Sequence, residues 1–242
     1  MQMWAHRGSG KGPLENTLHG FNTARQAGFD ATEFDVMLTA DGVPMVHHDW
    51  VMGRCAQSID PAMAALDSVT TFESLRRRDL LQYRVGGQAI PSLREVFDFC
   101  LQHDLRANVE LKATGPANAM RLGQAVLACI HACAPAQQER IQKNWVFSSF
   151  YHASLLPLKG FDLALLYEQL PDDWVLHADA LQASAIHLHW SAATVPVVRR
   201  IHTSGRRVRV YTGNDVDMLQ RLQALGVQGV FTDRMEFSKA PF

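Results

Sequence analysis

Short runs rich in apolar and β-branched residues alternate with helical stretches along most of the chain, and this alternation restricts the fold more than any other feature of the sequence. It is typical of a parallel β-sheet whose strands are joined by crossover helices. Because eight βα units close into a ring, we expect an α/β fold of the TIM-type (β/α)8 barrel class. The eight expected strands are Gln2–Ala5, Ala31–Val36, Ala107–Leu111, Trp145–Ser148, Leu163–Tyr167, Ala185–Leu188, Val208–Tyr211 and Gly229–Thr232.

The length of 242 residues fits one such barrel, since TIM barrels typically take about 250 residues. We therefore expect a single domain over residues 1–242. Residues 49–90 break the alternation, because they contain Pro61, Gly86 and Gly87 and no convincing βα unit. We interpret this segment as a small insertion over the barrel mouth, after the second strand and its hairpin. The alternative is a long surface loop, although structureless loops of that length are rare.

Helix boundaries can be predicted at two places. Ser92 and Glu95 have the spacing of a capping box, which predicts a helix that leads into the third strand. Near the end of the chain, Asn214 is expected to cap a helix and Gly226 is placed to end it.

Charge and composition exclude several classes of function. The 23 basic and 24 acidic residues leave a formal net charge of -1, so no broad positive field is available to bind nucleic acid. No apolar run approaches the roughly 20 residues that span a bilayer, and the first expected strand leaves no room for a secretory signal. The four cysteines form no CxxC pair and are expected to be reduced thiols. We expect a cytoplasmic protein without stable membrane association.

Ionisable residues gather at the ends of the first three expected strands. In TIM barrels the catalytic groups come from the C-terminal ends of the strands and the loops after them. Residues i and i+2 on a strand point to the same face, so two such pairs should project together into the barrel mouth. The residues concerned are His6, Arg7, Glu33, Asp35, Glu110 and Lys112.

The carboxylates of Glu33, Asp35 and Glu110 would repel one another in the mouth unless a cation lay among them. Ligand sets made only of oxygen suit hard divalent ions such as Mg²⁺ or Ca²⁺. For one carboxylate pair alone, a solvated strand end explains the sequence as well as a metal site does. Two ionisable pairs on nearby strands favour the metal site.

The Asp41-Gly42 dipeptide predicts a tight hairpin after the second strand. If these two residues form the turn, paired positions sum to 83, which puts His48 opposite Asp35 on the same face. His47 then points away and is expected to be structural. A shift of one residue in the turn would exchange the two histidines.

Two further groups are left outside the predicted catalytic set. His187 and His189 flank Leu188 at the end of the sixth expected strand and could reach the mouth. Ser148 and Ser149 could bind phosphate oxygens, but a serine after a strand often caps the next helix.

Taken in order, these residues resemble the motifs of the glycerophosphodiester phosphodiesterase family over the whole chain. Five ordered motifs and a closing Gly-Val-x-Gly-x-x-Thr-Asp pattern are far more specific than any single motif. They are His6-Arg7-Gly8, Glu15-Asn16-Thr17, Glu33-Phe34-Asp35, His48-Asp49, Glu110-Leu111-Lys112 and the segment from Gly226 to Asp233.

The resemblance implies a TIM barrel that hydrolyses glycerophosphodiesters to sn-glycerol 3-phosphate and an alcohol. It implies one divalent cation, Mg²⁺ or Ca²⁺, on the three carboxylates, with His6 and His48 as the catalytic acid and base. It also implies phosphate contacts from Arg7 and Lys112. Glu15 is expected to support the site.

Two positions depart from the family pattern. Leu14 separates Pro13 from Glu15, where the family usually has proline next to the glutamate. Tyr211 stands before Thr212, where the family usually has tryptophan, and is expected to line the glycerol side of the pocket.

Two rival functions could use the same barrel. A related activity on lipids, such as a lysophospholipase D or a phosphatidylinositol-specific phospholipase C, would need an exposed apolar rim, which the insertion could supply. A non-catalytic phosphate-binding barrel would be expected if a motif residue were missing, and none is. Homo-oligomer formation is left open.

Overall fold

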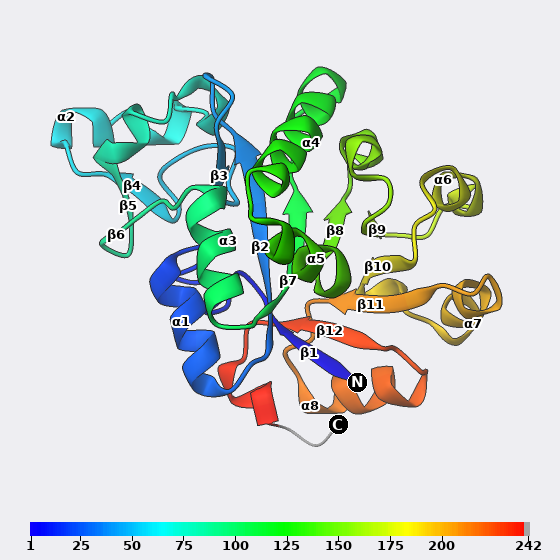
Figure 1. The fold of residues 1–242 in the computed structure, drawn as a ribbon. Helices are drawn as coiled ribbons and strands as arrows, with labels where there is room; N and C mark the ends of the chain where they lie inside the picture. The colour runs from blue at the N-terminus through cyan, green and yellow to red at the C-terminus, as the bar shows by residue number, and fades with distance from the viewer. Residues whose placement is uncertain (240–242) are drawn as a thin grey trace.

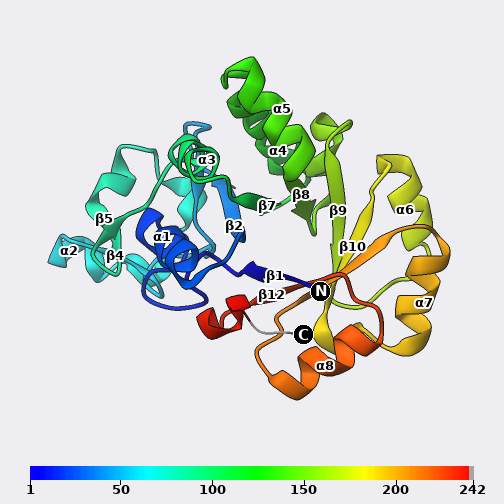
Figure 2. The same ribbon diagram turned by 60° about the horizontal axis from the view of Figure 1, so that its bottom comes forward.

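The computed structural model describes residues 1–239 and shows a ring of parallel strands with helices around it (Figures 1 and 2). The strands of the ring are β1 (Gln2–Ala5), β2 (Ala31–Leu38), β7 (Arg106–Leu111), β8 (Val146–Ser149), β9 (Asp162–Tyr167), β10 (Ala185–His189), β11 (Arg207–Tyr211) and β12 (Gly229–Thr232). They are hydrogen-bonded in the order β1-β12-β11-β10-β9-β8-β7-β2, and a pairing between Ala5 and Thr32 joins β1 to β2.

The predicted TIM-type barrel is therefore confirmed. Each of the eight expected runs is a strand of the ring, and no end differs from its expected position by more than two residues. The prediction succeeds because parallel strands are buried on both faces and read as short apolar runs.

Helices cover the outside of the ring, and the main hydrophobic core lies between them and the strands. The core includes the buried side chains of Phe21, Phe34, Phe97 and Trp145. Between β8 and β9 the crossover is a 3-10 helix, His152–Leu158, instead of an α-helix. The remaining helices of the ring are α1 (Leu18–Ala27), α3 (Leu93–Gln102), α4 (Pro116–His131), α5 (Pro135–Asn144), α6 (Trp174–Leu181), α7 (Val195–Thr203), α8 (Val216–Ala224) and the 3-10 segments Trp190–Ala192 and Met235–Lys239.

The capping box at α3 is confirmed, because the Ser92 backbone N–H donates to Glu95 and the Glu95 backbone N–H donates to the Ser92 hydroxyl. The predicted cap of α8 is wrong. Asp215, one residue later, accepts from the Met218 backbone N–H at 3.0 Å. Gly226 follows α8 with a left-handed φ of 82°, as expected of a residue that ends a helix.

The predicted register of the hairpin after β2 is also wrong by one residue. β3 (Pro44–Val46) pairs antiparallel with β2, and Val36 lies opposite Val46, so paired positions sum to 82. The loop has three central residues instead of two, because Thr39 and Val43 close it with a backbone hydrogen bond of 3.1 Å and Gly42 adopts a left-handed φ of 79°.

Residues 49–90 form a small subdomain to one side of the ring, next to α1 and α3 (Figures 1 and 2). It holds a three-stranded antiparallel sheet and a separate hydrophobic cluster that includes Met52, Phe72 and Tyr83. It is therefore not a structureless loop. Its elements are β4 (Ala56–Ser58), α2 (Pro61–Ala64), β5 (Tyr83–Val85), β6 (Gln88–Ala89) and the 3-10 turns Asp67–Val69, Phe72–Ser74 and Asp79–Gln82.

Candidate active site

A cavity of about 110 Å³ opens at the C-terminal ends of the barrel strands. Of the nine site residues expected from the sequence, all but Glu15 line it. Its lining residues are His6, Arg7, Glu33, Asp35, His48, Asn108, Glu110, Lys112, Phe150, Leu166, His187, Tyr211 and Phe231.

Each of the two predicted catalytic histidines binds an aspartate through Nδ1. The His6 Nδ1 lies 2.6 Å from Asp233 Oδ1, and the His48 Nδ1 lies 2.8 Å from Asp49 Oδ1. Burial acts to raise the pKa of both aspartates, but the hydrogen bonds and charges of their partners, including the histidines, together outweigh it, so both pKa values lie below the ordinary range. An ionised aspartate accepts only, so Nδ1 is the protonated nitrogen and Nε2 of each ring remains available for proton transfer.

Asp233 makes three further hydrogen bonds, with Lys11 and Asn214. The Lys11 backbone N–H and the Asn214 side chain donate to its carboxylate at 2.8 and 2.7 Å. The Asp233 backbone N–H donates to Asn214 Oδ1 at 2.8 Å. These bonds occupy Asn214, which explains why it does not cap α8. Gly10 allows the close approach, since a Cβ atom there would lie 2.4 Å from the Asp233 carbonyl oxygen.

The carboxylates of Glu33, Asp35 and Glu110 meet as predicted. One oxygen of each lies within 4.8 Å of the others, because adjacent strands place Asp35 opposite Glu110. Glu33 and Asp35 are 3% and 2% exposed, and Glu33 Oε1 is a buried oxygen with no hydrogen-bond partner.

Burial and the charges of Asp35 and Glu110 raise the pKa of Glu33 well above its ordinary value, and burial also raises the pKa of Glu110. For Asp35, burial is outweighed by His48, Arg7 and Lys112, so its pKa is lowered. The site thus has one carboxylate oxygen without a hydrogen-bond partner and two carboxyl groups whose pKa values are raised. Both features fit a site for a hard divalent cation.

Glu15 lies behind the cavity and holds Arg7 in place. It is 1% exposed, and its Oε1 accepts from Arg7 Nη1 at 2.9 Å and from Arg54 Nη2 at 2.6 Å. The Arg7 backbone N–H donates to Glu33 Oε2 at 2.9 Å. Arg7 therefore brings a fixed positive charge to the carboxylate cluster.

The two residues after Glu15 also have structural roles. Asn16 donates to Asp35 Oδ2 at 2.9 Å and accepts from the Asp35 backbone N–H at 3.2 Å. Thr17 caps α1 by accepting from the Gly20 backbone N–H at 3.0 Å. The Glu15-Asn16-Thr17 motif therefore joins the first helix to the carboxylate site.

Lys112 and Tyr211 lie at opposite sides of the lining. Lys112 Nζ is 3.8 Å from Asp35 Oδ1 and 3.7 Å from Glu110 Oε1. The Tyr211 hydroxyl donates to the Tyr167 carbonyl oxygen at 3.1 Å. Because its hydroxyl is bound to the backbone, Tyr211 offers the cavity mainly its ring.

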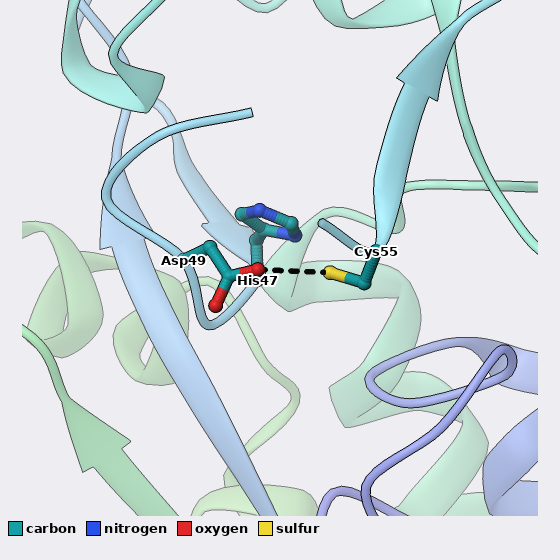
Figure 3. Close-up of side chains that lie close together, drawn as sticks. All are labelled: His47, Asp49 and Cys55. Atoms are coloured by element: carbon teal, nitrogen blue, oxygen red, sulfur yellow. Dashed lines mark hydrogen bonds between the residues drawn. The ribbon is translucent and has the colours of Figure 1, made fainter. Parts of the chain in front are cut away.

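Within residues 1–239, a second candidate ligand cluster consists of His47, Asp49 and Cys55 (Figure 3). The Cys55 thiol donates to Asp49 Oδ2 at 3.4 Å, and burial lowers the pKa of His47 to about 4. Both Asp49 oxygens already bind the Arg54 guanidinium, at 2.6 and 2.8 Å. A cation would lie beside this positive charge, so the three-carboxylate cluster is the better metal site.

His48 lines the cavity although the register argument for it was wrong. With the observed pairing it is His47 whose backbone N–H donates to Asp35 O, at 3.0 Å. β3 ends at Val46, and beyond it side chains no longer alternate strictly between faces. His47 instead stacks on Phe72, with ring centroids 5.0 Å apart.

Sequence reasoning assigned no role to several residues that the structure brings to the site. Among the polar ones are Asn16, Asn108, His187 and Asp233. Asp233 directly follows the last strand and belongs to the closing motif, which is the signal that could have found it. Asn108 lies two residues before Glu110 and therefore shares its face.

Among residues 1–239, no helix has both the length and the apolar character needed to cross a membrane.

The chain is similar to known proteins over nearly its whole length. Residues 6–237 match the model of the glycerophosphoryl diester phosphodiesterase family. A glycerophosphodiester phosphodiesterase from Bacillus altitudinis is 27% identical, over 96% of this chain and 94% of that protein.

Solved structures are similar over nearly the full length. An Oleispira antarctica phosphodiesterase, in complex with the product sn-glycerol-3-phosphate, superimposes with a TM-score of 0.85 at 26% identity, covering 99% of this chain and 95% of that one. A glycerophosphodiester phosphodiesterase from Thermotoga maritima gives a TM-score of 0.75 at 26% identity, covering 97% and 95%.

Proposed function

The chain belongs to the glycerophosphoryl diester phosphodiesterase family, and from this premise we propose that it hydrolyses small glycerophosphodiesters to sn-glycerol 3-phosphate and an alcohol, using one divalent cation and two histidines. Membership makes it a phosphodiesterase. The observation that supports the finer proposal is one cavity in which His6 and His48 face three clustered carboxylates.

Glu33, Asp35 and Glu110 would hold the cation, and Mg²⁺ and Ca²⁺ are the candidates because the ligands are all oxygen. When bound, the cation would supply a fixed positive charge for a phosphate oxygen. Arg7 and Lys112 line the same cavity and would bind the non-bridging phosphate oxygens, so that charge developing in the transition state meets positive groups already in place.

His6 and His48 would divide the proton transfers between them. With Nδ1 bound to aspartate, Nε2 of one ring accepts the proton of the nucleophile and Nε2 of the other protonates the departing alkoxide. The aspartates fix ring orientation and stabilise the imidazolium, as a buried carboxylate does in other acid–base pairs.

The proposal is tested by incubating the protein with a panel of glycerophosphodiesters and measuring released glycerol 3-phosphate. Product is expected with Mg²⁺ or Ca²⁺ and not after exhaustive chelation. Full turnover in chelated protein would contradict the metal assignment. Failure to cleave any member of the panel with metal present would contradict the substrate assignment.

A lipid substrate is the second candidate, because several apolar side chains of the subdomain remain exposed. Val51, Met63, Leu66 and Leu81 are between 37% and 66% exposed, whereas Met52 is buried. A lysophospholipase D or phospholipase C activity would be seen as turnover of lysophospholipid or phosphatidylinositol vesicles exceeding that of glycerophosphocholine. The cytoplasmic location expected from the sequence stays a prediction.

A further inference from the structure

One layer of side chains below the mouth, the barrel interior contains an arginine. Arg209 of β11 is 7% exposed, and its guanidinium carbon lies 5.3 Å from the Trp4 ring centroid. Gly229 on the neighbouring strand makes room for it, since a Cβ atom there would lie 3.1 Å from the Arg209 side chain. The ring thus accommodates a charged group at a depth that TIM barrels usually fill with branched apolar residues.

Arg209 fixes the tautomer of His187. Its Nη1 lies 3.0 Å from His187 Nε2, and a guanidinium has no acceptor, so Nε2 must be the unprotonated nitrogen. His187 is fully buried, and both burial and Arg209 lower its pKa well below the ordinary value. The proton of the neutral ring is therefore on Nδ1.

His187 Nδ1 is a buried atom without a hydrogen-bond partner, and His187 lines the catalytic cavity. Asn108 provides the complementary atom. Its Nδ2 donates to Ser148 Oγ at 2.9 Å, whereas its Oδ1 is buried and unpartnered in the lining of the same cavity. The unpartnered atoms of the cavity lining also include Glu33 Oε1 and Arg7 Nε, which belong to the predicted metal and phosphate sites. The remaining donor and acceptor, on His187 and Asn108, match a group that both accepts and donates a hydrogen bond.

Both residues lie one layer below the strand tips, and Asn108 pairs in register with Glu33 on β2. Asn108 precedes Glu110 by two residues on β7, and His187 precedes His189, the last residue of β10, by two. Two residues correspond to about 6.7 Å along a strand. With phosphate held at the tips, the atom of a glycerophosphodiester that reaches furthest down is the terminal hydroxyl of glycerol, which is both donor and acceptor.

We propose that His187 and Asn108 are specificity-determining residues that bind the terminal hydroxyl of the substrate's glycerol half, with Arg209 as the positioning residue that keeps the His187 donor facing it. This inference rests on the proposed function. It assigns the deep end of the cavity to glycerol and leaves the variable alcohol at the mouth.

The test compares sn-glycero-3-phosphocholine with its analogue in which propane-1,2-diol replaces glycerol, so that only the terminal hydroxyl is missing. The wild-type holoenzyme should prefer the glycerol compound by about 10- to 100-fold in kcat/KM, because the analogue leaves two buried polar groups unpaired. In His187→Phe and, separately, in Asn108→Leu, the preference should fall below about threefold.

His152→Phe is the matched control. His152 also has a buried, unpartnered nitrogen, but it lies outside the cavity lining. This variant should keep the wild-type preference even if it is less stable. If Asn108→Leu, or a folded His187→Phe, retained the full preference, the assignment would be overturned.

Binding is measured in parallel, by calorimetry with Mg²⁺, for sn-glycerol 3-phosphate and for the corresponding phosphate of propane-1,2-diol. This comparison separates the two proposals. If neither diester is cleaved, the proposed function fails, while a tighter binding of glycerol 3-phosphate that disappears in the two variants still supports hydroxyl recognition. Equal affinity of the wild type for both phosphates overturns it.

Discussion

At the scale of single residues, adjacent histidines have opposite environments. His48 is 28% exposed, lines the cavity and binds Asp49, whereas His47 is 1% exposed and stacks on Phe72. We predict that His48→Ala lowers kcat/KM by about 10² to 10⁴, the range for losing a general acid or base.

His47→Ala is the comparison for this prediction. It removes a buried ring, so it should lower the unfolding temperature while the folded fraction keeps kcat within a few-fold. Steady-state kinetics and thermal unfolding of both variants measure the two effects separately. A large kinetic loss at His47 with a nearly normal His48→Ala enzyme would reverse the assignment.

Tyr211 is a residue whose ring and hydroxyl can be tested apart. The hydroxyl binds the Tyr167 carbonyl oxygen, and the ring packs edge-on against Phe150 with ring centroids 5.9 Å apart. The face that Tyr211 offers the cavity is therefore apolar. Tyr211→Ala should cost roughly 1.5–3 kcal/mol, or about 10- to 150-fold in kcat/KM, equally for glycerophosphocholine and glycerophosphoethanolamine.

Tyr211→Trp and Tyr211→Phe should be tolerated, because both keep an aromatic face. An unchanged kcat/KM in a folded Tyr211→Ala enzyme would mean that Tyr211 only packs.

At the scale of elements, the subdomain of residues 49–90 is tied to the site by one arginine. Arg54 donates hydrogen bonds to two carboxylates, Glu15 and Asp49. Glu15 also binds Arg7, and Asp49 also binds His48. We propose that this link makes the subdomain and the barrel one domain. Arg54→Gln should therefore lower kcat/KM by about 10-fold or more. Losses of this size are typical when a residue that hydrogen-bonds to and orients site side chains is removed.

Arg84→Gln is the control for this element. Arg84 lies on β5 in the same subdomain and donates to the carbonyl oxygens of Leu81 and Tyr83, away from the cavity. It should leave turnover near the wild-type value. Limited proteolysis should cut within residues 49–90 faster in Arg54→Gln than in Arg84→Gln. Equal kinetics in the two variants would show that the link does not matter for catalysis.

The elements also show where sequence reasoning stops. Strand positions can be predicted because buried strands have locally apolar sequences. The hairpin register cannot be predicted in this way, because the Thr39 hydroxyl accepts from the Val43 backbone N–H and lengthens the loop by one residue. Likewise, Asn214 and Asp215 are equally good caps locally, and the choice depends on Asp233, which is distant in sequence.

His187 illustrates the same limit at the site. A histidine near a strand end is an ambiguous signal, and only the arrangement of Arg209 and Gly229 on neighbouring strands gives its ring a fixed direction. The carboxylates were predictable, because two residues apart on one strand is a local relation and the motif order supported it.

At the scale of the whole molecule, the carboxylate site should couple metal, pH and stability. A carboxyl group whose folded pKa is raised binds more protons folded than unfolded, so stability falls as pH rises from the unfolded value of about 4.3 through the raised pKa. Glu33 and Glu110 are such groups in the metal-free protein. A cation that binds the ionised carboxylates should remove this loss.

We therefore predict that Mg²⁺ or Ca²⁺ raises the unfolding temperature, and that the increase grows from acidic to neutral pH. At 100 times Kd the gain corresponds to about 2.7 kcal/mol. Glu33→Gln should stabilise the metal-free protein near neutral pH and reduce the metal-dependent increase. A pH-independent increase, or none at neutral pH, would contradict the site.

β1 and β12 lie side by side, and the contact between His6 and Asp233 spans 227 positions of sequence (Figure 1). During synthesis, the first histidine and all three carboxylates exist long before the aspartate that orients that histidine. The chain carries most of its chemical groups early but cannot align them until its last strand docks against its first. On the proposed mechanism, turnover requires that the ring has closed, and a partly folded chain that exposes the same residues is expected to be inactive.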